Sequence, residues 1–195
     1  MRTHDIKALL TILLFLTGDA ASVLGQGQVL LGNNAMSLIR IGDPVNGPPI
    51  PISSMFFQLH VGTVGTPEGS LTPLLPVAPT SSTTEGRIFN TVIDVSAQFL
   101  SAPPGFEAIY QIWAWSRSFA TYQDAANGGG LVGKSILFVT YTSPNTDPPS
   151  APTSLAGLYP GFAVSLVPEP STWALLTLGG VGCWQVIRRQ RRNSR

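Results

Sequence analysis

Charged side chains are scarce in this chain, at 11% of its 195 residues, and they are unevenly placed. Five of the basic residues lie in the last eight positions, whereas residues 26–167 hold four cations against seven anions. A protein that binds nucleic acid needs a dense basic face that displaces counterions from the phosphates. The middle of the chain has no such face, so we expect no nucleic-acid partner.

Cysteine and histidine are almost absent as well. The single cysteine, Cys183, lies near the C-terminus and has no second thiol with which to form an intrachain disulfide. Beyond residue 25 the only histidine is His60, which excludes the usual ligand sets for zinc. Closely spaced acids of the kind that calcium loops require do not occur either. We therefore expect neither a metal ion nor another cofactor.

The first 25 residues have the pattern of a secretory signal peptide. Arg2 and Lys7 precede an apolar stretch from Ala8 to Leu16, and small residues follow. As a helix this stretch would be roughly 14 Å long, far below the ~30 Å hydrocarbon core of a bilayer. We predict a signal helix that directs export through the Sec translocon and that signal peptidase removes, by cleavage between about residues 22 and 25.

The last segment, residues 167–195, opens with Pro168, Glu169 and Pro170. Each proline fixes its own φ and restricts the residue before it, so this part stays extended and a helix can begin only from about Ser171. The apolar run 173–187 that follows would form about 22 Å of helix, which is marginal for spanning a membrane.

A basic cluster follows the apolar run and would hold that end of the chain in the cytoplasm. The cluster consists of Arg188, Arg189, Arg191 and Arg192. With a signal peptide at one end and a basic tail at the other, the middle of the chain is expected on the far side of the membrane. The sequence thus predicts a short C-terminal transmembrane helix that acts as a transient inner-membrane anchor.

This three-part ending resembles the PEP-CTERM sorting signal of Gram-negative bacteria that make extracellular polysaccharide. In that family an exosortase, an integral-membrane cysteine-type transpeptidase, recognises and processes the tail after export. The resemblance implies that Pro168, Glu169 and Pro170 are the sorting motif and that the arginines are the retention signal. The alternative is a permanent single-span anchor, which the glycines at 179, 180 and 182 disfavour.

Between the two ends, residues 26–166 are expected to form one exported domain of mainly β structure. Short β-rich runs alternate with glycine and proline breaks, a pattern typical of an antiparallel β-sandwich. One short helix is expected at about Ser118–Ala126, and the proline-rich stretch Gly65–Thr84 is expected to be a long exposed loop. The expected strands are Val29–Leu31, Met36–Ile41, Met55–Val61, Arg87–Val95, Glu107–Ser116, Ser135–Thr142 and Phe162–Val167.

Three blocks in this middle resemble a set of PEP-CTERM proteins from Verrucomicrobia and relatives. The blocks are Gly65–Leu71, Ala120–Ala126 and Val132–Ser135. No activity is assigned to that set, so the resemblance supports the fold and the location and implies no catalytic residues.

Trp113 and Trp115 are the candidate ligand surface. They lie two residues apart in an expected strand, so they share one face while Tyr110 and Ile112 point to the other. Tryptophans at this spacing could stack against the sugar rings of an extracellular polysaccharide, or they could belong to the core of a strand covered on both sides. We expect core packing and keep the ligand surface as the alternative.

Residue patterns with catalytic chemistry are weak. His60 lies in an expected strand and lacks a G-x-S-x-G serine, and Asp94 and Glu107 are two of several scattered acids in neighbouring expected strands. Residues 128–135 match a phosphate-loop pattern, but a helix precedes them and a strand follows, which is the reverse of the required order. Lys134 is therefore expected to face solvent. We expect a cell-surface or extracellular-matrix protein without enzymatic activity.

Overall fold

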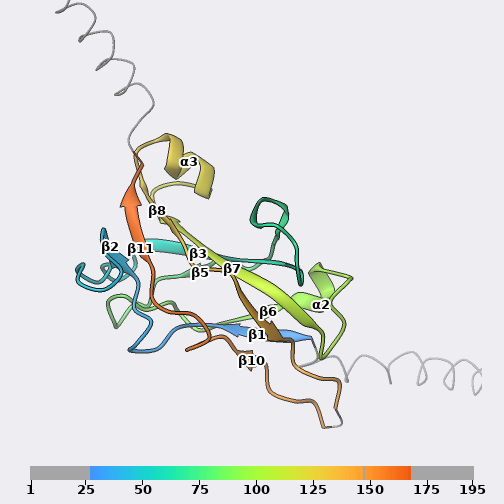
Figure 1. Ribbon diagram of the computed structural model, residues 1–195. Coiled ribbons are helices and arrows are strands. Elements are labelled where there is room, and N and C mark those ends of the chain that lie inside the picture. Colours follow the sequence, from blue (N-terminus) through green and yellow to red (C-terminus); the bar gives the residue numbers. More distant parts are fainter. Residues whose placement is uncertain (1–26, 147, 168–195) are drawn as a thin grey trace, which may run out of the picture.

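The computed structural model describes residues 27–146 and 148–167 (Figure 1). The predicted signal peptide, the Pro-Glu-Pro motif, the apolar run 173–187 and the arginine cluster lie outside these residues. Within the described ranges, no helix is long and apolar enough to cross a membrane.

The described chain is mainly β, with three short helical segments. The strands are β1 (Gln28–Leu31), β2 (Arg40–Ile41), β3 (Met55–Thr63), β4 (Thr72–Pro73), β5 (Ala78–Pro79), β6 (Thr91–Asp94), β7 (Glu107–Ser116), β8 (Leu131–Lys134), β9 (Phe138–Tyr141), β10 (Thr153–Ser154) and β11 (Ala163–Leu166). The helical segments are the 3-10 turn η1 (Glu68–Ser70) and the α-helices α2 (Val95–Gln98) and α3 (Tyr122–Asn127).

The strands form two sheets. The smaller has the order β10-β1-β6, and the larger follows β2-β11-β8-β7-β3-β4, with β5 also paired to β3 and β9 to β7. The centre of the larger sheet is the antiparallel ladder of β3 and β7, which runs from Met55 opposite Ser116 to Thr63 opposite Ala108. In Figure 1 these two strands cross the middle of the molecule, and α3 lies near the end of β8 and β11.

One hydrophobic core receives side chains from both sheets. Val29 of β1 and Ile93 of β6 are fully buried in the same cluster as Leu59 of β3 and Ile112 of β7. Full burial of such a side chain contributes about 1.5–3 kcal/mol, and alternate residues of β3 and β7 supply it along the whole ladder. The β structure predicted from alternating apolar residues is therefore confirmed.

A second, smaller cluster lies on the opposite face of the larger sheet. It consists of the buried residues Trp115, Ala125 and Val132, with Phe56, Val77, Phe119, Tyr122, Ala126 and Val167 packed around them. α3 covers this face. Its N-cap Thr121 accepts a hydrogen bond from the Asp124 backbone N–H, and Gly128 follows its last residue. The helix therefore starts later than the expected Ser118.

The sequence pattern predicts antiparallel strand pairs, but two of the observed pairs are parallel. β1 pairs with β10 in parallel, and β2 pairs with β11 in parallel. The expected strand Met36–Ile41 shrinks to β2 because the Asn34 side chain accepts hydrogen bonds from the N–H groups of Met36 and Ser37 and bends the chain there.

Two further strands are shorter than expected because side chains end them. Asp94 caps α2 by accepting a hydrogen bond from Ala97 N at 2.9 Å, so the expected strand through Val95 ends at Asp94. Ser135 Oγ accepts a hydrogen bond from Ile112 N at 2.9 Å, which replaces a ladder bond and separates β8 from β9.

The proline-rich stretch 65–84 is not a free loop. Leu71, Leu74 and Ala78 within it are buried, and β4 and β5 both pair with β3. Prolines are tolerated in short edge strands such as these, where one N–H is not needed by the ladder. The stretch therefore forms the rim of the larger sheet.

Candidate functional site

Trp113 and Trp115 project from β7 on the face away from the main core, as their spacing predicts. Trp115 is only 2% exposed, belongs to the second cluster, and donates its indole N–H to Phe119 O at 3.2 Å. Trp113 is half-buried. Only Trp113 of the pair therefore keeps surface that a ligand could reach.

The Trp113 ring is held between side chains from the two strands that flank β7. His60 of β3 stacks on it at 4.1 Å between centroids and 17° between planes, and Lys134 Nζ of β8 lies 3.9 Å from the indole centroid. The indole N–H donates to Gln111 Oε1 at 2.7 Å, and Tyr122 contacts the ring at 4.7 Å. A ligand surface at Trp113 stays a prediction, and stacking there would require Lys134 to move.

Lys134 does not point freely into solvent, in contrast to the expectation. Besides the indole contact, its Nζ forms an ion pair with Glu68 Oε1 at 2.8 Å. This contact lowers the pKa of Glu68 and fastens η1 onto the face of the larger sheet. Exposed pairs and cation–π contacts of this kind each contribute about 0–1 kcal/mol.

His60 is buried, at 5% exposure, and neither ring nitrogen makes a hydrogen bond of normal geometry within the described residues. Burial lowers the pKa of His60 to about 4, and it outweighs the Leu71 backbone, which favours the charged form. The imidazole is thus neutral at pH 7 and packs as an aromatic ring.

Asp94 and Glu107 do not lie in neighbouring strands. Asp94 ends β6 in the smaller sheet and caps α2, whereas Glu107 is the exposed first residue of β7 in the larger sheet. Within the residues that the structure describes, no three potential ligands among His, Cys, Asp and Glu gather to hold a metal ion.

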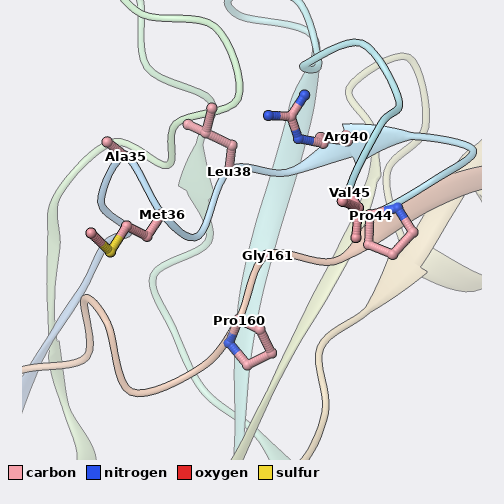
Figure 2. Close-up of a pocket in the computed structure, with 8 residues that line it drawn as sticks. All are labelled: Ala35, Met36, Leu38, Arg40, Pro44, Val45, Pro160 and Gly161. Atoms are coloured by element: carbon pink, nitrogen blue, oxygen red, sulfur yellow. The ribbon is translucent and has the colours of Figure 1, made fainter.

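Hollows on the surface of the described residues include one apolar and one polar example. The first, of about 440 Å³, lies beside β2 and is mostly apolar; in Figure 2, Arg40 borders one side of it and Met36 and Pro160 border the other. The Arg40 guanidinium donates from Nη1 to Gly47 O at 2.6 Å, so this cation already has a hydrogen-bond partner in the protein.

The second hollow, of about 350 Å³, is polar and lies on the turn between β5 and β6. The first hollow brings residues 35–45 together with Pro160 and Gly161, and the second brings Asn33 to residues 81–90, so neither is evident from the sequence.

The sorting motif begins at the end of the last strand. β11 runs to Leu166, and Val167 packs against the second cluster. Residues 166–192 match the family model of the PEP-CTERM protein-sorting motif, a range that contains Pro168, Glu169, Pro170 and the four arginines from 188 to 192. No curated protein and no solved structure matches the chain.

The match identifies the chain first as a protein that carries a C-terminal sorting signal. More specifically, it carries the PEP-CTERM signal, as the residues had suggested, which implies export, exosortase-dependent sorting to the cell surface, and an exosortase as the processing partner.

Proposed function

We propose that this protein is a non-catalytic structural component of the cell surface or extracellular matrix. The sorting motif at residues 166–192 is the observation that carries the proposal. In this scheme residues 1–25 direct export through the Sec translocon and are removed by signal peptidase. The apolar run 173–187 then holds the protein in the inner membrane until the exosortase acts.

We infer further that the exported body, residues 26–166, is a β-sandwich. The support is the main core, to which both sheets contribute fully buried side chains. The non-catalytic role is supported by the state of His60, which is buried. His60 is neutral and stacked on Trp113, and neighbouring Glu68 is held in an ion pair, so neither is placed as a free acid or base.

A carbohydrate-binding or adhesive role on the Trp113 surface is the second candidate. Trp113 is half-buried and lies among the side chains of Tyr122, Lys134 and Glu68, a mixture of aromatic and polar groups that suits a sugar. In this role extracellular polysaccharide would be the partner. Protection of Trp113 from acrylamide quenching by added polysaccharide would favour it, and unchanged quenching would favour the structural role.

Intact-mass analysis of the protein isolated from its native cell surface tests the main proposal. We expect a species that has lost about 22–25 residues from its N-terminus and that ends between Pro168 and Thr172. A mature species that still carries residues 173–195 would instead identify a permanent anchor.

A further inference from the structure

The polar hollow between β5 and β6 has the size of a small-molecule site. Its volume of about 350 Å³ falls in the range of roughly 300–1,000 Å³ that is usual for small-molecule sites. It is lined by Asn33, Ser81, Ser82, Thr83, Thr84, Arg87, Ile88, Phe89 and Asn90. Neither Trp113 nor Trp115 lines it, so it is separate from the surface considered above.

The backbone around the hollow is held in place by hydrogen bonds. Ser81 N donates to Arg87 O at 2.8 Å, and Thr80 and Ile88 form a β-bridge. The buried Asn33 amide donates to Ser37 O and Gly86 O and accepts from Ile88 N. A site with this support is formed before a ligand arrives, which lowers the entropic cost of binding.

Arg87 is the only charged group that lines the hollow. Its Nη1 donates to Asn33 O at 2.7 Å, and its Nε is enclosed by protein atoms, so Nη2, which makes no hydrogen bond within the described residues, is the nitrogen left for a ligand. The ion pair found in the described part of the chain is Lys134 with Glu68, so no described carboxylate neutralises Arg87. A guanidinium presents its N–H groups as a planar fork that matches a carboxylate. The structure thus leaves an anion-binding group without its anion.

The residues around Arg87 select among anions. Ser82, Thr83, Thr84 and Asn90 are exposed and offer hydroxyl and amide groups, whereas no acidic side chain lines the hollow. The Phe89 ring is 54% exposed and provides an apolar surface beside these polar groups. A pyranose ring that carries a carboxylate has all three complementary features: hydroxyl groups, an apolar C–H face and a negative charge.

We propose that the Arg87 hollow binds an acidic sugar, a uronic acid unit of a glycan. Its carboxylate accepts hydrogen bonds from the Arg87 guanidinium, its hydroxyls bond to the turn 82–84 and Asn90, and its C–H face packs on Phe89. This site does not depend on the sorting function proposed above, and either can fail without the other.

Calorimetric titration of the full chain in detergent solution tests the proposal. The probes are a trigalacturonate, a neutral trigalactose of the same length, and inorganic phosphate. We expect the acidic trisaccharide to bind at least tenfold more tightly than either of the others. Arg87→Gln should weaken its binding by roughly tenfold or more, because a charge-assisted pair is lost.

Matched variants separate the site from general charge effects. Arg117→Gln removes another cation, which lies over the Phe56 ring and does not line the hollow, and should leave affinity unchanged. Phe89→Ala removes an exposed ring and should weaken binding severalfold without unfolding the protein, which keeps the test decisive if Arg87→Gln does not fold. Equal binding of the neutral sugar or of phosphate, equal loss in Arg117→Gln, or full affinity in Phe89→Ala would each overturn the proposal.

Discussion

Lys134 lies directly opposite Trp113 in the β7–β8 ladder, and its ammonium group contacts the indole ring and the Glu68 carboxylate at once. Glu68 is 66 residues away in the chain. One side chain therefore connects the centre of the larger sheet to the proline-rich rim. This contact is the first that should be tested by substitution.

Lys134→Ala should loosen the rim and uncover Trp113. We expect a loss of about 0.5–1.5 kcal/mol in the free energy of unfolding, since a cation–π contact and an ion pair are both removed. Acrylamide should quench Trp113 more strongly, measured in a background where Trp173 and Trp184 are phenylalanine. Glu68→Gln is the matched control, because it breaks only the ion pair; equal quenching in both variants would show that the ring contact does not shield the indole.

The stability of the protein should fall as the pH falls from about 6.5 to about 4. Burial lowers the pKa of His60 to about 4, so in this window the unfolded chain binds a proton that the folded chain does not. The folded protein keeps its full stability above the pKa that His60 has in the unfolded chain. It loses part of this stability as the pH falls towards the pKa of His60 in the folded protein. After allowance for solvent screening we expect roughly 1–3 kcal/mol from this group.

His60→Gln tests this pH dependence, because glutamine is polar and does not titrate. Urea unfolding at pH 7, 5.5 and 4.5 should show a flatter profile for the variant than for the unsubstituted protein. If the free energy of unfolding changes with pH equally in the variant and in the unsubstituted protein, the carboxylates and not His60 cause the pH dependence.

Asn33→Ala should destabilise the protein by about 2–4 kcal/mol. The Asn33 amide makes three hydrogen bonds to the backbone at a buried position, and its removal leaves the Ile88 N–H and the Ser37 carbonyl unpaired, whereas Gly86 O keeps its bond from Ile39 N. Asn90→Ala changes an exposed amide in the same region and should cost no more than about 0.5 kcal/mol. Thermal or urea unfolding of the two variants checks the difference, and similar losses would contradict the assigned role of Asn33.

Replacing the motif Pro168-Glu169-Pro170 by three alanines should block processing in the native host. The exosortase would no longer recognise the tail, so a protein that retains residues 173–195 should accumulate in the membrane fraction. Alanine at the exposed Pro148 and Pro149 is the control and should leave processing unchanged. Normal maturation of the motif variant, measured by intact mass, would contradict a recognition role for these residues.

Where a sequence signal is local, the structure agrees with it. β7 has the predicted bounds, Glu107–Ser116, because its two faces are both apolar and the alternation continues for ten residues. The sorting motif was likewise evident, since its three parts follow one another in the chain.

Where the signal depends on contacts between distant residues, the sequence could not reveal it. β8 follows three glycines and pairs with β7 and β11, so its strand character depends on its neighbours. The neutral state of His60 depends on burial that its own strand does not provide, and the Arg87 hollow depends on the Asn33 amide, 55 residues before Ile88.

Val167 packs on the folded body one residue before the Pro-Glu-Pro motif, so the protein has no spacer between its domain and its sorting signal. An enzyme that reads this motif therefore binds a segment that begins directly after a side chain packed on the folded body. The shape of that body then becomes part of what the enzyme has to accommodate. A bulky substitution on α3 should slow processing of the tail although the sorting motif itself is unchanged. A few glycines inserted after Val167 should restore the rate of processing.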